Sequence, residues 1–168
     1  MLCYEGEVKA LTLKQPWASL ILSGAKRVET RSWSTAYRGP LIITASKALS
    51  KADHNLCYTE PFRAALALAG FVPHPGGTKG QHMQAKERLP LGCALCVVDL
   101  VACLPTQDLK PFLLARELAF GDYTAGRWAW IFTGRVWRIP NEPKVKGALS
   151  LWTPPAALAA EADRVMRP

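Results

Sequence analysis

The pattern of apolar and polar positions along the chain predicts a set of short strands. Val8 to Lys14 alternates between the two classes, which is typical of a strand with one buried face. Leu91 to Leu104 is the most apolar stretch, so we expect it to be a central strand of a sheet or barrel. Further strands are expected at Lys26 to Trp33, Leu41 to Ala45, Trp128 to Thr133, Arg135 to Ile139 and Ala148 to Trp152, with a hairpin turn at Thr133-Gly134.

Proline and glycine mark the ends of the expected helices. Pro16 suits the first turn of a short helix, because its missing N–H would be unpaired there, and Gly24 supplies a left-handed stop. Other helices are expected at Ser50 to Gly70 with an interruption near Pro61, at Thr106 to Ala119 with Pro111 delaying its regular start, and from about residue 154. Short strands with small helices between non-adjacent ones favour an α+β fold, with a compact mixed barrel rather than a doubly wound sheet.

Length and loop composition indicate one domain. A chain of 168 residues with 49% apolar and 20% charged residues has the size and composition of a single globular domain. Residues 71–90 contain three prolines and three glycines, which predicts a long loop or insertion. We therefore expect one domain over residues 1–168, with a loop insertion at 71–90 and a C-terminal helix.

Positive charge is concentrated in two segments that also hold most of the tryptophans. The formal net charge is +8, yet residues 9–47 alone carry +6 and residues 123–150 carry +4. Five of the six tryptophans lie in these two segments. Interleaved cations and indoles can hold phosphates and stack bases, so this pattern favours a polyanionic partner such as nucleic acid. The alternative is that the tryptophans are core residues and the cations are ordinary surface residues.

Several other classes of protein do not fit the sequence. It has no apolar run long enough to span a bilayer and no N-terminal signal pattern, so we expect a cytoplasmic protein without a membrane partner. The five cysteines are an odd number and lie mostly in apolar stretches, which indicates buried thiols. Cys93 and Cys96 have the spacing of half a zinc site, but the other half is missing, so neither a metal nor a cofactor is expected.

A succession of motifs points to a family. The pattern G-x-K-x-x-E-x-R is met at Gly24, Lys26, Glu29 and Arg31. It is accompanied by the segments Gln15-Pro16-Trp17-Ala18, Tyr37-Arg38-Gly39-Pro40, Ala45-Ser46-Lys47, Phe120-Gly-Asp-Tyr123 and Gly126-Arg-Trp-Ala-Trp130. Over about residues 8–155 this succession resembles the ASCH family (activating signal cointegrator homology) of the PUA-like superfamily. The resemblance implies a small mixed β-barrel surrounded by short helices, with a cleft lined by the G-x-K-x-x-E-x-R motif.

The resemblance and the residues together suggest a nucleic-acid or modified-nucleoside binding module. Proteins similar to this one are proposed to bind RNA or DNA, and we favour RNA, with the chain acting as a monomer. In an extended segment Glu29, Arg31 and Trp33 share a face, so one carboxylate should lie between the cations of Lys26 and Arg31. The candidate binding residues are Lys14, Trp17, Lys26, Glu29, Arg31, Trp33, Arg38, Ser46, Lys47, Arg127, Trp128 and Lys146, with Trp33 and Trp128 as the candidates for stacking.

Three other interpretations of the motif remain open. Some small proteins similar to this one are amidohydrolases that remove an acyl group from N4-acylated cytidine, using a Lys, a Thr three positions later and a distant Glu. Lys26 matches the Lys, Glu29 stands where the Thr would be, and Glu117 or Asp122 is available as the distant acid, so the candidate catalytic set is Lys26, Glu29 and Glu117. A protein-interaction adaptor is the next alternative. The last is a Glu29–Arg31 pair that only braces the barrel.

Overall fold

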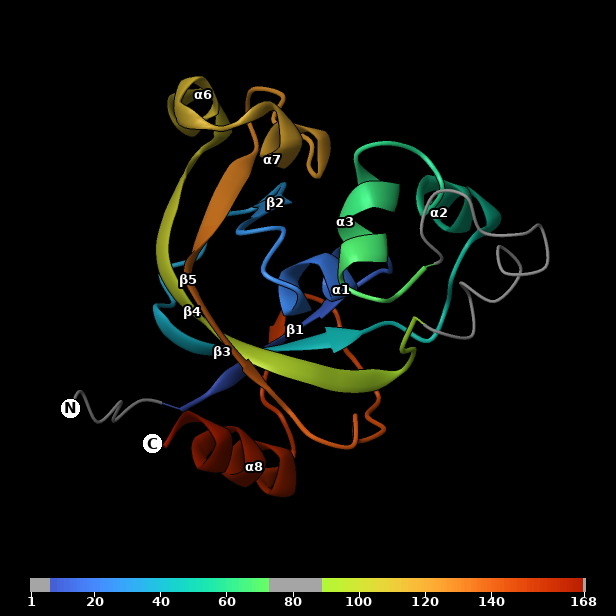
Figure 1. Cartoon of the computed structure of the whole chain (residues 1–168). Helices are drawn as coiled ribbons and strands as arrows, with labels where there is room; N and C mark the ends of the chain where they lie inside the picture. The colour runs from blue at the N-terminus through green and yellow to red at the C-terminus, as the bar shows by residue number, and fades with distance from the viewer. Residues whose placement is uncertain (1–6, 73–88, 168) are drawn as a thin grey trace.

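The computed structural model describes residues 7–72 and 89–167, and its centre is a curled, six-stranded mixed sheet (Figure 1). The strand order is β2-β5-β4-β3-β1-β6, in which β1 and β3 are parallel and all other neighbours are antiparallel. The strands are β1 (Lys9–Leu13), β2 (Val28–Arg31), β3 (Gly39–Ala45), β4 (Cys93–Pro105), β5 (Trp128–Arg138) and β6 (Leu151–Trp152). In the described part of the chain β2 and β6 each pair on one side only, so the sheet is an open half-barrel. The α+β fold expected from the sequence is confirmed.

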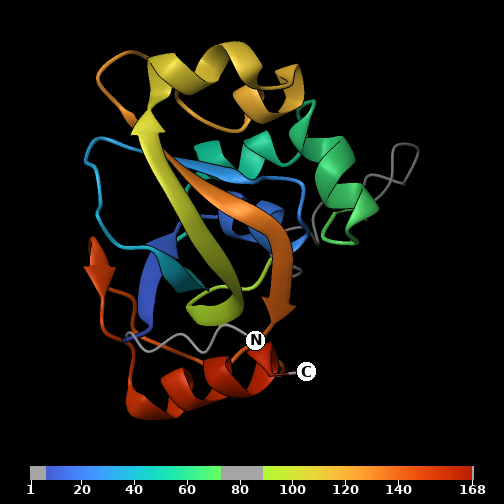
Figure 2. The ribbon, with the colours of Figure 1, turned by 90° about the vertical axis from the view of Figure 1, so that its left-hand side faces the viewer.

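The two longest strands, β4 and β5, form the curved spine of the sheet (Figure 2). They pair from Cys96 opposite Arg138 to Pro105 opposite Trp128, with register shifts around Leu100 that allow the pair to bend. The expected hairpin turn at Thr133-Gly134 is therefore wrong. The residues before and after Gly134 both pair with β4, so the backbone continues through Gly134 as the single strand β5.

Short helices cover the sheet on several sides. They are α1 (Trp17–Leu22), α2 (Lys51–Leu56), α3 (Phe62–Leu68), α6 (Thr106–Leu109), the 3₁₀ helix η1 (Lys110–Phe112), α7 (Ala115–Ala119) and α8 (Ala156–Met166). The break between α2 and α3 near Pro61 and the C-terminal helix agree with the sequence expectation. The single helix expected at Thr106 to Ala119 is wrong, because the chain at Pro111 forms a 3₁₀ turn and Leu113 and Leu114 are extended before α7 begins.

The core is divided between the two faces of the sheet. Inside the curl, α1 packs on residues such as Leu11, Ile43 and Trp130, all at most 1% exposed. A neighbouring cluster joins Leu20 of α1 to α3 and Phe120. On the opposite face α8 covers the lower part of β1, β3 and β4 (Figure 2). Residues 73–88, which make up most of the expected insertion, lie outside the described residues.

Candidate functional site

Three residues of the G-x-K-x-x-E-x-R motif come together at the start of β2. Val28 and Thr30 are buried on one face of this strand, whereas Glu29 and Arg31 are half-buried on the other, as period-two geometry predicts. Glu29 Oε2 lies 3.6 Å from Lys26 Nζ, and Glu29 Oε1 lies 3.3 Å from Arg31 Nε. The carboxylate therefore lies between two cations, as expected from the sequence. Only 12% of the Glu29 side chain is exposed.

Lys26 is buried, although a lysine is normally a surface residue. The turn after α1 places it there: Gly24 has φ +77° and the Lys26 N–H donates to Leu20 O over 3.1 Å. Lys26 is 1% exposed, and its Nζ donates to Val28 O and, over 3.0 Å, to Phe120 O. Burial lowers the pKa of Lys26, and the nearby carboxylates of Glu29 and Glu117 only partly oppose this.

Glu117 connects α7 to the same strand. Its carboxylate accepts from the backbone N–H of Arg27 over 3.1 Å and of Val28 over 3.1 Å. The candidate catalytic set Lys26, Glu29 and Glu117 is thus gathered in one place. Side-chain hydrogen bonds therefore join residues 26–29 to residues 117–120. One runs from Lys26 Nζ to Phe120 O, and another from the Arg27 N–H to the Glu117 carboxylate.

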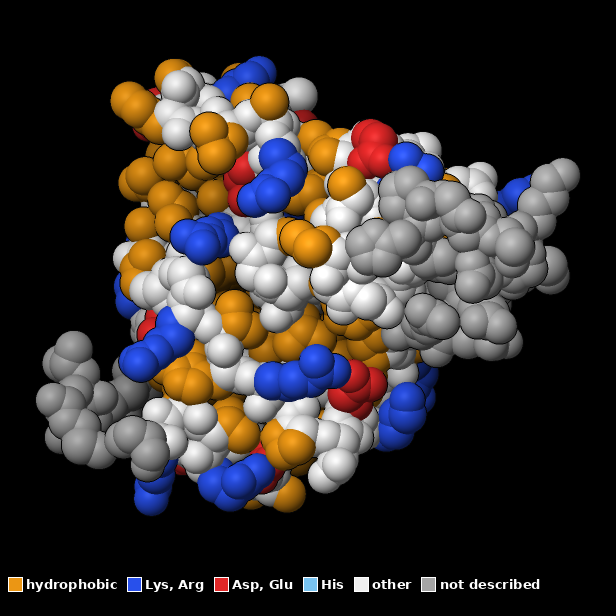
Figure 3. All heavy atoms as spheres, viewed as in Figure 1, with side chains coloured by type: hydrophobic (Ala, Val, Ile, Leu, Met, Phe, Trp, Pro, Cys, Tyr) orange, Lys and Arg blue, Asp and Glu red, His pale blue; other side chains and the backbone are white. Residues whose placement is uncertain are grey.

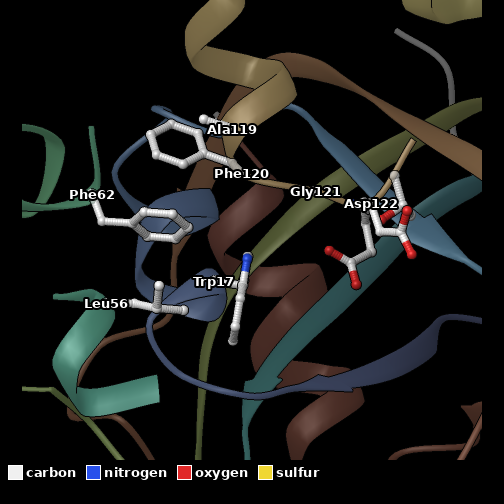
Figure 4. Close-up of a pocket in the computed structure, with 9 residues that line it drawn as sticks. Trp17, Leu56, Phe62, Ala119, Phe120, Gly121 and Asp122 are labelled. Carbon is white, nitrogen blue, oxygen red and sulfur yellow. Dashed lines mark hydrogen bonds between the residues drawn. The ribbon is translucent and has the colours of Figure 1, made fainter. Parts of the chain in front are cut away.

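A pocket of about 390 Å³ opens beside Glu29 (Figure 4). One side of it is apolar and carries three aromatic rings, from Trp17, Phe62 and Phe120. The Trp17 and Phe62 ring centroids lie 6.1 Å apart with an interplanar angle of 89°, and those of Phe62 and Phe120 lie 5.0 Å apart at 73°. Leu56 and Ala119 complete this side.

The opposite side of the pocket is polar and acidic. It is formed by Glu29, Thr30, Gly121 and Asp122. Thr30 Oγ1 accepts from the Asp122 N–H over 3.1 Å, which ties this loop to β2. The Thr124 N–H and hydroxyl, together with the guanidinium of Arg127, hold the pKa of Asp122 below its usual value. No Lys, Arg or His is among the described residues that line the pocket.

Two arginines flank these carboxylates. Arg127 Nε lies 3.4 Å from Asp122 Oδ2, and its Nη2 donates to Thr30 O over 3.3 Å. Arg31 Nη2 donates to Thr12 O over 3.3 Å. The Arg31 and Arg127 side chains are 25% and 29% exposed, so both are partly accessible.

The two tryptophans predicted to stack on a ligand pack inside the curl of the sheet. Trp33 lies edge-on to Trp130, with 4.6 Å between ring centroids, and its carbonyl accepts from Trp130 Nε1. Trp128 lies opposite Arg31 in the β2–β5 register and is half-buried against the same core. Neither residue lines the pocket, whereas Trp17 does.

The other predicted binding residues lie outside the pocket. Lys14, Arg38, Lys47 and Lys146 are exposed, and Ser46 donates through Oγ to Ala48 O over 2.9 Å. On the face of the molecule that Figure 3 shows, Lys and Arg side chains are spread among apolar side chains rather than gathered in one patch. The pocket beside Glu29 is therefore acidic and aromatic, and these predicted cations lie outside its lining.

Sequence reasoning did not single out Phe62 or Thr30 for the site. Phe62 lies in the helix expected at Ser50 to Gly70, and Thr30 alternates with Glu29 and Arg31 along the strand expected at Lys26 to Trp33. Phe120 and Asp122 could have been found from the sequence, because they belong to the Phe120-Gly-Asp-Tyr123 motif. That motif did not by itself indicate a pocket. In the described part of the chain there is no cluster of three or more His, Cys, Asp or Glu suited to a metal ion, and no helix long and apolar enough to cross a membrane.

The half-barrel and the motif on β2 define an ASCH domain, and the comparison with known families agrees. The family model "ASCH domain" matches residues 11–141, so the chain belongs to this family. Activating signal cointegrator 1 from Homo sapiens is 34% identical over 100 residues, and that from Mus musculus is 35% identical over 100 residues. These matches cover 60% of this chain but only 15% of either relative.

A solved structure of another ASCH protein aligns with nearly all of the chain, at lower sequence identity than these relatives. The crystal structure of a Tyr-to-Phe mutant of an ASCH protein from Zymomonas mobilis aligns with a TM-score of 0.47 and 14% sequence identity. The alignment covers 96% of this chain and 97% of that one.

Proposed function

We propose that this ASCH domain binds single-stranded nucleic acid, RNA in preference to DNA, or a modified nucleoside, by taking one base into the pocket beside Glu29. The observation that carries the proposal is the combination of three aromatic rings on one side of the pocket with the bracketed Glu29 carboxylate on the other. Aromatic rings offer a face or edge to any base, and a carboxylate accepts from its N–H groups. Membership of a family associated with RNA binding supports the same function.

The surrounding cations suit the backbone of the bound strand. Arg31 and Arg127 flank the pocket and remain partly exposed, and Lys14, Lys47 and Lys146 are free to contact phosphates farther away. Base recognition and phosphate contact would then be carried out by different residues, as is common in proteins that bind single strands.

The proposal is tested by titrating labelled single-stranded RNA at several salt concentrations. If about three or four phosphates are contacted, log Kd should rise with log salt with a slope of about 2 to 3. Arg127→Gln should reduce this slope, whereas Arg164→Gln, on the distant helix α8, should leave it unchanged. Binding no stronger than that of an unrelated basic protein, with the same slope for both variants, would refute the proposal.

A second candidate function is hydrolysis of an N4-acylated cytidine. It is favoured by the meeting of Lys26, Glu29 and Glu117, and by the lowered pKa of Lys26, which is suitable for a general base. Against it, Lys26 Nζ already donates to two backbone carbonyls, and Glu117 already accepts from two backbone N–H groups. Release of cytidine from N4-acetylcytidine, abolished by Glu117→Gln in a folded protein, would establish it.

A further inference from the structure

The hydrogen-bonding character of the pocket limits which base it can take. Its side-chain acceptors are the Glu29 and Asp122 carboxylates and the Thr30 hydroxyl, whose oxygen already accepts from the Asp122 N–H. Lys26, Arg31 and Arg127, the cations close to it, each donate to a backbone carbonyl and none of them lines the pocket. A carboxylate accepts hydrogen bonds and donates none. A base edge that presents an acceptor to Glu29 would therefore lose a bond to water and be repelled, so the edge facing Glu29 must consist of donors.

Trp17 adds one donor at the other side. Figure 4 shows its indole edge-on, with the nitrogen directed into the space that Phe62, Phe120 and Asp122 surround. The Trp17 Nε1–H has no hydrogen-bond partner among the described residues, and an indole nitrogen can only donate. The pocket thus offers two acceptors on Glu29 and a donor on Trp17.

We infer that the pocket reads guanine, with the adjacent N1–H and N2 amino group on the Glu29 carboxylate and O6 facing the Trp17 nitrogen. This inference rests on the proposed function and names the base that the site selects. Guanine has two neighbouring donors on one edge, followed by an acceptor. Adenine and cytosine place a ring acceptor beside their amino group, and uracil has a single N–H between two acceptors.

The position of Glu29 makes it suitable for this role. Lys26 and Arg31 approach its two oxygens from 3.6 Å and 3.3 Å, so the carboxylate is fixed in direction while each oxygen keeps a lone pair for a ligand. The buried Lys26 cannot move towards the ligand, because Val28 O and Phe120 O hold its Nζ. A carboxylate fixed in this way needs little reorganisation when the base binds.

The test compares oligouridines that differ in one central base. With the full chain at near-physiological salt, fluorescence anisotropy should give about tenfold tighter binding for guanine than for adenine, cytosine or uracil at that position. Inosine, which lacks the N2 amino group, should fall between guanine and uracil. This comparison changes only the ligand, so it holds even if a protein variant fails to fold.

The protein side of the test uses one carboxylate in the pocket and one far from it. Glu29→Gln should make the four oligonucleotides bind alike while a salt-dependent affinity for oligouridine persists. Asp163→Asn, an exposed position on α8, removes a carboxylate elsewhere and should keep the guanine preference. Binding of all four with equal affinity by the wild type, or a preference for cytidine or N4-acetylcytidine, would overturn the inference and leave the proposed function standing. No binding of any oligonucleotide would refute the proposed function itself.

Discussion

Lys26 and Phe120, which are 94 positions apart in the sequence, are joined by a hydrogen bond of 3.0 Å from the lysine Nζ to the phenylalanine carbonyl. The same Nζ holds Val28 O and lies 3.6 Å from Glu29. One buried ammonium group therefore fixes both the strand that carries Glu29 and the loop that forms the facing wall of the pocket. Its first role in this structure is to hold the site in shape.

Loss of this ammonium group should destabilise the protein strongly. Lys26→Met keeps much of the side-chain volume but removes the donor for the Val28 and Phe120 carbonyls and one of the two cations beside Glu29. We expect the free energy of unfolding to fall by about 3 to 5 kcal/mol, as measured by urea denaturation. The double variant with Glu29→Gln should recover part of the loss. An unchanged midpoint for Lys26→Met would show that the lysine does not brace the site.

The same residue predicts a pH dependence. Burial lowers the pKa of Lys26 from its ordinary value of 10.5. Between the lowered pKa and the unfolded value, the unfolded chain binds more protons than the folded chain, so this residue makes the free energy of unfolding rise with pH. Below the lowered pKa both states are protonated and the effect is flat.

Comparison with Lys26→Met isolates this contribution from those of other groups. Urea unfolding at a series of pH values should show the stability advantage of the wild type over the variant growing as the pH rises from the lowered pKa of Lys26 towards 10.5, and remaining constant below that lowered pKa. An advantage that shrinks as the pH rises would mean that the folded protein binds the proton more tightly than the unfolded chain, contrary to the burial of this group.

Glu117 should act through the backbone it holds. Glu117→Ala removes the acceptor for the Arg27 and Val28 N–H groups and should lower the free energy of unfolding by about 2 kcal/mol. Glu117→Gln retains one acceptor oxygen and should lose less. Thermal unfolding checks both. If both variants unfold at the wild-type temperature, these bonds contribute nothing to stability.

Two tryptophans should separate binding from stability. Trp17→Ala removes a wall of the pocket, so the affinity of the folded variant for single-stranded RNA should fall about tenfold, with some loss of stability because the ring also packs edge-on to Phe62. Trp33→Ala removes a ring that packs on Trp130 and should destabilise the fold by about 2 to 4 kcal/mol with less effect on the affinity of the folded protein. Anisotropy titrations and urea denaturation of both variants provide the comparison. If Trp33→Ala weakened RNA binding more than Trp17→Ala did, Trp33 rather than Trp17 would be the residue that stacks on the base.

Burial should also order the reactivity of the cysteines. Burial raises the pKa of Cys57 to about 11 and of Cys96 to about 12, and that of Cys93 also rises. Cys103 is partly exposed on β4. Limited alkylation with iodoacetamide at mildly alkaline pH, followed by peptide mass spectrometry, should label Cys103 before these three. In urea all four should react alike. Equal labelling of Cys96 and Cys103 in the native protein would contradict the packing of the core.

The sequence predicted the parts of the site that depend on local geometry. Alternation along β2 placed Glu29 and Arg31 on one face, and Pro16 and Gly24 marked the ends of α1. These patterns need only the strand period and the backbone preferences of two residue types. The family resemblance then supplied the fold, which the half-barrel confirms.

The remaining features depend on contacts between distant segments. The sequence could not predict the burial of Lys26, because one of the two carbonyls that accept from it belongs to the distant Phe120. Phe62 had the spacing of an ordinary core residue, and only the packing of α3 beside α1 brings it to the pocket. The turn expected at Thr133-Gly134 was wrong for the same reason, since pairing with the long β4 outweighed the local preference.

The most direct test of the pocket compares single-stranded RNA with the same strand in a duplex. A base can enter the pocket only when it is unpaired, whereas phosphates are available in both forms. We predict that at near-physiological salt the single strand binds about tenfold more tightly than the duplex, and that Trp17→Ala removes the difference. Equal or tighter binding of the duplex by the wild-type protein would contradict the account, because the aromatic and acidic pocket beside Glu29 would then take no part in recognition.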